Sequence, residues 1–130
     1  MPFPLVFCMP EGTSQATFRQ IRTEMVATLS AMIPKVKPGW VVPRFLADMA
    51  DAPVTPDEGG STILIQLDTA MFTKLDEAEA NELAPRVTRA LCNIVHRALN
   101  ARFEVECMVM GANPAWISVV PADVPVPVPD

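Results

Sequence analysis

The sequence predicts an α+β fold in which two strand–helix–strand repeats form a four-stranded mixed sheet, with two helices on one face. Two long stretches carry apolar side chains at helical spacings of three and four residues, and short apolar runs typical of strands flank each stretch. A helix between two strands of one sheet usually makes them parallel, with a right-handed crossover. We expect one domain over residues 1–120, with repeats at about 2–50 and 61–120.

The first repeat is expected to open with a buried strand at Phe3–Met9. The pair Glu11-Gly12 marks a turn, and Thr13 or Ser14 can cap the next helix, because a side-chain oxygen accepts a hydrogen bond from an orphan backbone N–H. The apolar stripe of that helix comprises Phe18, Ile21, Met25, Leu29 and Met32.

Prolines shape the rest of the first repeat. Pro34 and Pro38 end the helix, and Trp40–Leu46 is expected to form the second strand. Pro43 lies near the middle of that run and cannot donate to a ladder, so the strand should lie at a sheet edge or carry a bulge. The segment Ala50–Gly60 is rich in Pro, Asp and Gly and is typical of a loop.

The second repeat has the same order. Ser61–Leu67 predicts a strand, a helix should begin within Thr73–Asp76, and Phe103–Met110 predicts the last long strand. Pro85 lies within the helical pattern and should kink or break the helix. The stripe of this helix comprises Leu83, Val87, Leu91, Ile94 and Ala98.

The end of the chain differs from the repeats. Trp116–Val120 can add one short strand, and Pro121–Asp130 alternates proline and valine and should be extended and solvated. With both helices on one face, the other face of the sheet is left partly apolar and needs a cover. A homo-oligomer is the simplest cover.

Composition excludes several classes of function. The net charge of −5 weighs against nonspecific binding to nucleic acid, and no apolar stretch is long enough to span a membrane. The N-terminus has no basic region before a long apolar segment, so we expect a cytoplasmic protein. The three cysteines suit small buried residues, and His96, the only histidine, suits an ordinary helix position. We expect no metal and no other cofactor.

Pro2 is the residue with the most distinctive chemistry. A start methionine before a small residue is commonly removed, and removal of Met1 would leave Pro2 as a free secondary amine at the mouth of a strand. Burial among apolar side chains disfavours the charged form of an amine, which suits a general base. The structural alternative is a proline that merely begins an edge strand.

Short motifs in this order resemble the tautomerase superfamily. Pro2 leads a strand that ends in Glu11-Gly12, Leu46-Ala47-Asp48-Met49-Ala50 is followed by Gly59-Gly60, and Asn113-Pro114-Ala115-Trp116 follows the last long strand. The resemblance covers roughly residues 2–120 and implies a trimer whose sheets face inward, with an active site at each subunit boundary.

The resemblance also implies site residues. Pro2 would be the base or nucleophile, Arg44 would bind a substrate carboxylate, with Pro43 as the competing match, and Trp116 would wall the pocket. Two departures stand against it. Thr13 follows the Glu-Gly pair where an arginine is expected, and the run Asp68-Thr69-Ala70 lies where some branches carry arginines.

Three functions stay open at this stage. The first is a tautomerase-like isomerase that uses Pro2 on a small keto acid. The second is a non-catalytic trimeric scaffold or small-ligand binder of the same fold. The third is a ferredoxin-like binding module, which needs neither Pro2 nor a trimer.

Overall fold

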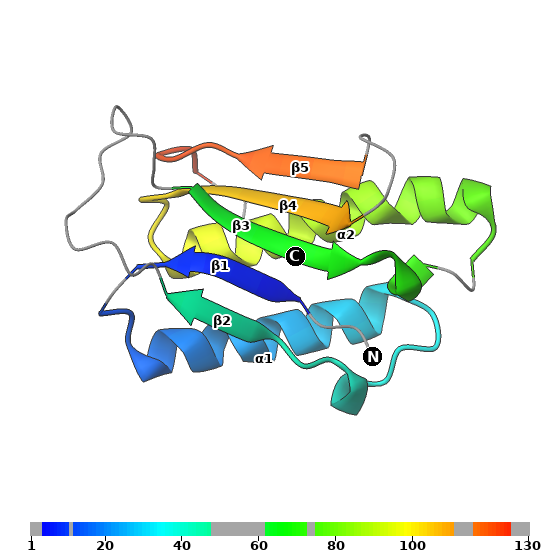
Figure 1. Cartoon of the computed structure of the whole chain (residues 1–130), viewed down its shortest axis with the longest axis horizontal. Coiled ribbons are helices and arrows are strands. Elements are labelled where there is room, and N and C mark those ends of the chain that lie inside the picture. Colours follow the sequence, from blue (N-terminus) through cyan, green and yellow to red (C-terminus); the bar gives the residue numbers. More distant parts are fainter. Residues whose placement is uncertain (1–3, 11, 48–61, 73–74, 111–115, 126–130) are drawn as a thin grey trace.

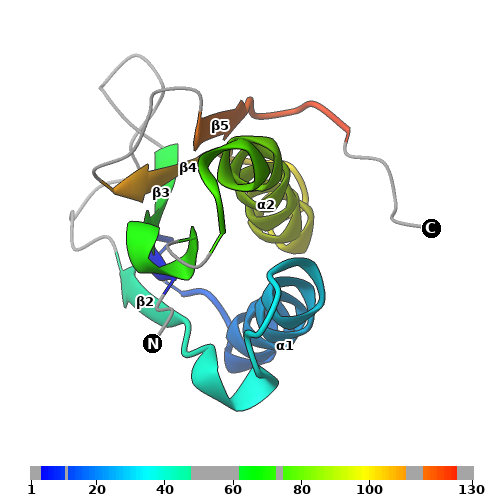
Figure 2. The same ribbon diagram turned by 90° about the vertical axis from the view of Figure 1, so that its right-hand side faces the viewer.

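The computed structural model describes residues 4–10, 12–47, 62–72, 75–110 and 116–125. Within them, five strands form one mixed sheet in the order β2-β1-β3-β4-β5 (Figure 1). Helices α1 and α2 lie side by side against one face of the sheet, and no described helix covers the other face (Figure 2). The α+β class and the placement of both helices are as predicted, while the sheet has five strands instead of four.

The strand–helix–strand order occurs twice. The first half comprises β1 (Leu5–Met9), α1 (Gln15–Met32), a 3-10 turn (Pro38–Trp40) and β2 (Arg44–Ala47). The second comprises β3 (Thr62–Asp68), a 3-10 turn (Thr69–Phe72), α2 (Glu77–Ala98) and β4 (Glu104–Met110), followed by β5 (Ile117–Val120). The strands within each half are parallel, as predicted, and β1 joins the halves by pairing antiparallel with β3.

The start of α1 follows the predicted capping chemistry. Gly12 has a φ of 84°, a left-handed conformation that glycine adopts without strain. Ser14 is the N-cap, and its side chain accepts a hydrogen bond from the Thr17 backbone N–H at 3.1 Å. The Thr13 hydroxyl donates instead to the carbonyl of Pro10 at 2.6 Å. The apolar stripe faces the sheet, and its fully buried members are Ile21, Met25 and Leu29.

Strand β2 begins later than the sequence predicts. The first part of the expected strand forms the 3-10 turn, and pairing starts only at Arg44. The cause is Pro43, which has no N–H, so the Arg44 N–H is the first to pair and donates to the Pro4 carbonyl at 2.9 Å. The prediction that this strand lies at a sheet edge is confirmed.

The sequence predicts a kink or a break at Pro85, and the break does not occur, because helix α2 runs without interruption through this residue. The missing N–H costs one backbone hydrogen bond. The helix instead gains the packing of nine buried residues, and the Thr88 hydroxyl donates to the Pro85 carbonyl at 3.0 Å. At its N-terminus Asp76 is the N-cap, whose carboxylate accepts from the Glu79 N–H at 2.8 Å.

His96 lies in α2 as predicted, but it is not an ordinary helix residue. Its side chain is 1% exposed, with Nδ1 at 3.0 Å from the Phe103 carbonyl and Nε2 at 2.8 Å from the Val124 carbonyl. The Asp123 N–H also donates to the Ala101 carbonyl at 2.7 Å. The beginning of the proline-valine tail is therefore bound to the domain, whereas residues 126–130 lie outside the described residues.

The three cysteines do not share one environment. Cys92 and Cys107 are buried as expected, and burial raises the pKa of the Cys107 thiol, which therefore stays protonated. Cys8 is exposed, so the prediction was wrong for this residue. The reason is an irregularity in β1 between Val6 and Met9, where Cys8 takes a φ of 66° and leaves the regular alternation of the strand.

Candidate functional site

Several predicted site elements lie outside the described residues. These are Pro2, Glu11, the segment Ala50–Gly60 with its glycine pair, and Asn113-Pro114-Ala115. The described part of the site is therefore built from the neighbours of Pro2 along the chain and across the sheet. They begin with Pro4, which is buried and whose carbonyl accepts the hydrogen bond from Arg44.

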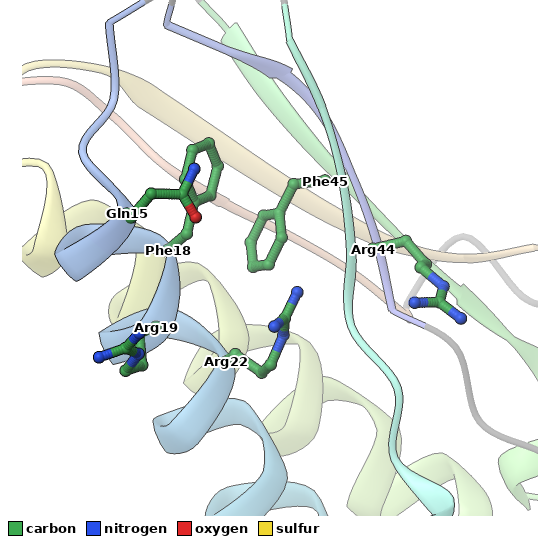
Figure 3. Close-up of a pocket in the computed structure, with 6 residues that line it drawn as sticks. All are labelled: Gln15, Phe18, Arg19, Arg22, Arg44 and Phe45. Carbon is green, nitrogen blue, oxygen red and sulfur yellow. The ribbon is translucent and has the colours of Figure 1, made fainter.

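Arg44 and Phe45 point to opposite sides of β2. The Phe45 ring packs on Phe18 of α1, with ring centroids 5.0 Å apart, so it faces the helix layer. Successive strand residues alternate between faces, which places the Arg44 side chain on the face without helices. Figure 3 shows the Arg44 guanidinium on the other side of β2 from the Phe45 ring. Arg44 is exposed, as a residue that receives a ligand must be.

The register of the strands aligns Arg44 with a row of residues across this open face. Leu5 pairs with both Arg44 and Gln66, Gln66 pairs with Met108, and Met108 pairs with Ile117. Strands lie about 4.8 Å apart, so Gln66 is about 10 Å from Arg44 across the sheet. The row is apolar except for the guanidinium at its edge and the amide at its centre.

Gln66 is a candidate that the sequence analysis missed. It is half-buried, lies in the middle of the sheet, and can both donate and accept hydrogen bonds. The available signal was a single amide in the otherwise apolar run Ile63–Leu67. The neighbouring Asp68 is less suited to a ligand, because its carboxylate accepts from the Ala70 N–H at 2.8 Å.

Trp116 lies far from Arg44 within the chain. It precedes β5, and three strands separate β5 from β2, which corresponds to about 19 Å. Its indole N–H donates to the Asn81 side chain at 2.9 Å, and its ring packs on Phe72 with centroids 5.4 Å apart. These contacts hold Trp116 against the N-terminal part of α2. The two predicted substrate-binding residues are therefore not brought together by the fold of a single chain.

Neither a metal site nor a membrane-spanning helix is found among the described residues. In those ranges, no three His, Cys, Asp or Glu side chains gather as a metal site would require. Neither of the described helices combines the length and the apolar character that crossing a bilayer demands.

The comparisons with known proteins identify a fold. No model of a known protein family matches the sequence, and no curated protein matches it. Among solved structures, the chain is similar to a "Q0 fused 4-OT wild type symmetric trimer", with a TM-score of 0.61, 17% identity and 82% of each chain covered. It is also similar to a macrophage migration inhibitory factor-like protein from Entamoeba histolytica, with a TM-score of 0.49, 13% identity and 75% coverage of each chain. The chain thus has the fold of the tautomerase superfamily, as its motifs suggested.

Proposed function

We propose that this chain, which has a tautomerase-type fold, is an isomerase that uses Pro2 as general base on a small keto/enol carboxylic acid. It needs no cofactor in this proposal and acts in the cytoplasm. The observation that carries the proposal is the backbone hydrogen bond between Arg44 and Pro4, at the end of β1 from which Pro2 extends.

Covalent geometry links Pro2 to Arg44. Two peptide units join Pro2 to Pro4, so their Cα atoms are at most about 7 Å apart. The Arg44 backbone N–H donates a hydrogen bond to the Pro4 carbonyl. Among the described residues, no carboxylate pairs with the Arg44 guanidinium. A guanidinium offers two parallel N–H donors to a carboxylate. A keto acid held by Arg44 can therefore present its α-carbon to an amine at the start of the chain.

The reaction is a proton transfer that balances without a co-reactant. The Pro2 nitrogen takes a proton from the carbon next to the carbonyl, and the C–H electron pair becomes the enol double bond. The protonated proline then returns the proton to oxygen or to another carbon of the conjugated system. Arg44 stabilises the negative charge that develops on the oxygens.

A homotrimer is part of the proposal. The open face and its edges expose large apolar side chains, which are Leu46, Met110, Ile117 and Val119. A second subunit that covers them would bury apolar surface at about 25 cal/mol per Å². The similar fused 4-OT structure is a symmetric trimer. Such an assembly can bring the β5 edge of one subunit, with Trp116, to the β2 edge of the next, with Arg44.

Replacement of Pro2 tests the catalytic role. A positioned general base contributes about 10²- to 10⁴-fold, so Pro2→Ala should lower kcat/KM for phenylpyruvate tautomerisation by at least about 100-fold. The matched control is Pro121→Ala, an exposed proline next to β5, which should keep full activity. Arg44→Gln should raise KM. Equal turnover in Pro2→Ala and wild type would refute the role of Pro2.

A non-catalytic trimeric scaffold or small-ligand binder is the second candidate. The observation that favours it is Thr13, which stands where the resemblance expects an arginine and whose hydroxyl is already bonded to the Pro10 carbonyl. Retention of Met1 would also favour it, because Pro2 would then be an amide without a basic nitrogen. Absence of turnover for a panel of enolisable keto acids, with a trimer still formed, would support this candidate.

A further inference from the structure

A cavity of about 380 Å³ lies between the first half of α1 and strand β2. It lies mainly on the α1 side of β2, where the Phe45 ring packs, and its lining extends to Arg44 at the edge of the sheet (Figure 3). Its volume is within the range of pockets that hold small organic ligands. Its lining comprises Gln15, Phe18, Arg19, Arg22, Arg44 and Phe45.

The lining is strongly basic in an acidic protein. Three of the ten Lys and Arg residues of the chain line this cavity, no acidic residue does, and the net charge of the chain is −5. Among the described residues, one ion pair is present, between Arg97 and Glu24. It does not involve Arg19, Arg22 or Arg44. Guanidinium groups without carboxylate partners favour an anion.

An aromatic wall lies next to these charges. The Phe18 and Phe45 rings meet edge to face, at 5.0 Å between centroids and 60° between planes. The Arg22 guanidinium lies 5.8 Å from the centroid of the Phe45 ring, which holds it beside the aromatic surface (Figure 3). The pair of rings remains half-buried, so part of its apolar surface is open to a ligand.

The spacing on α1 places four of the lining residues on one face of the helix. Gln15, Phe18, Arg19 and Arg22 follow one another at intervals that place them on one face of a helix. Gln15 adds an amide that can donate to a carboxylate oxygen. A ligand with a flat apolar ring against the phenylalanines and a carboxylate toward Arg22 would match both the aromatic and the basic part of the lining.

We propose that this cavity is a second binding site, for small aromatic carboxylates, on the α1 side of strand β2. The carboxylate binds Arg22, with Arg19 and Gln15 at its side, and the aromatic ring packs on Phe18 and Phe45. The site does not depend on catalysis at Pro2.

Calorimetric titration of the full chain with benzoate tests the site, because benzoate has no α-proton and is not a substrate. Loss of one charge-assisted hydrogen bond weakens binding about tenfold, which is the effect expected for Arg22→Gln. Phe45→Leu should weaken benzoate several-fold. The matched control is Arg89→Gln, which removes an exposed arginine of α2 and should change the affinity less than twofold.

Three further results decide between this site and its alternatives. Benzamide and inorganic phosphate should bind at least tenfold more weakly than benzoate, because one lacks the charge and the other the ring. Pro2→Ala should bind benzoate as wild type does, even if it loses turnover, so failure here and failure of the catalytic proposal are distinguishable. Equal weakening by Arg22→Gln and Arg89→Gln, or no benzoate binding by wild type, would overturn the proposal.

Discussion

The two halves of the molecule share the strand–helix–strand order but differ in the regularity of their strand pairing and in the number of residues that their helices bury. In the second half, β3 and β4 pair over seven residues each without a register shift, and α2 buries nine residues. In the first half, β1 and β2 have five and four residues, their register is interrupted near Cys8, and α1 buries three residues. The second half contributes more of the shared hydrophobic core, and the first half carries Arg44 and the cavity between α1 and β2.

This difference has a physical basis. Burial of apolar area stabilises a domain. An exposed side chain on an edge strand contributes less to this stability, but it can bind a ligand. Regions with fewer buried contacts also open locally at lower free energy. We therefore expect hydrogen exchange to be slower in α2 and β4 than in α1 and β2.

The largest effect is expected from Leu91→Ala in the second half. Leu91 is fully buried, so the substitution removes apolar contacts and leaves a cavity, which costs about 2–5 kcal/mol of unfolding free energy. Urea denaturation measures it. Leu83→Ala, at a half-buried position of the same helix, is the control and should cost clearly less. Equal costs at both positions would contradict the assignment of the core.

Replacement of His96 should have the next largest effect. His96→Leu removes the ring contacts to the Phe103 and Val124 carbonyls, and the loss of a hydrogen bond to a buried group costs about 1–3 kcal/mol. The beginning of the tail should also lose its anchor, so limited proteolysis near residue 124 should become faster. Arg86→Ala, at an exposed position of α2, is the control for stability. An unchanged cleavage rate in His96→Leu would show that the ring does not hold the tail.

Loss of the α1 cap should have a smaller and more local effect. Ser14→Ala removes the acceptor for the Thr17 N–H and should cost about 1 kcal/mol. Ser14→Asp keeps an acceptor and should keep the stability. Hydrogen exchange should accelerate mainly in the first turn of α1, and an increase spread equally over α2 would contradict a local effect of this cap.

The smallest effect is expected from titration of the α2 cap. The Glu79 N–H holds the pKa of Asp76 below its ordinary value, so Asp76 stabilises the fold at pH above about 4 and this contribution is lost as the pH falls through the folded-state pKa. The side-chain hydrogen bond with Asp76 raises the pKa of Glu79, which acts in the opposite direction. Unfolding curves from pH 6 to 2 should show a small loss of unfolding free energy, and this loss should be smaller in Asp76→Asn. An equal loss in Asp76→Asn and wild type would show that other groups cause it.

Much of the fold could be predicted from the periodicity of apolar residues in the sequence. The stripes of both helices and the alternation of β4 follow from spacing alone, because burial on one face requires an apolar residue at each turn or at every second position. Spacing cannot report what tertiary packing overrides. Pro85 is tolerated because its helix is well packed, and Cys8 is exposed because a bulge changes the side to which it points.

The site was less predictable than the fold. The sequence singled out Arg44, but it could not show that Arg44 and Trp116 lie at opposite edges of the sheet. It could not bring Arg19 and Arg22 to β2, because no local pattern in the sequence links α1 to that strand. Contacts between residues more than 20 positions apart, such as Phe18 with Phe45, depend on the whole topology.

The intact mass of the protein, purified from the cell in which it is naturally made, tests the catalytic claim most directly. A catalytic Pro2 requires the mass of a chain that begins with unmodified Pro2 and lacks only Met1. A mass that includes Met1, an acetyl group or any further residue would leave no basic nitrogen at Pro2, and would contradict the proposed chemistry.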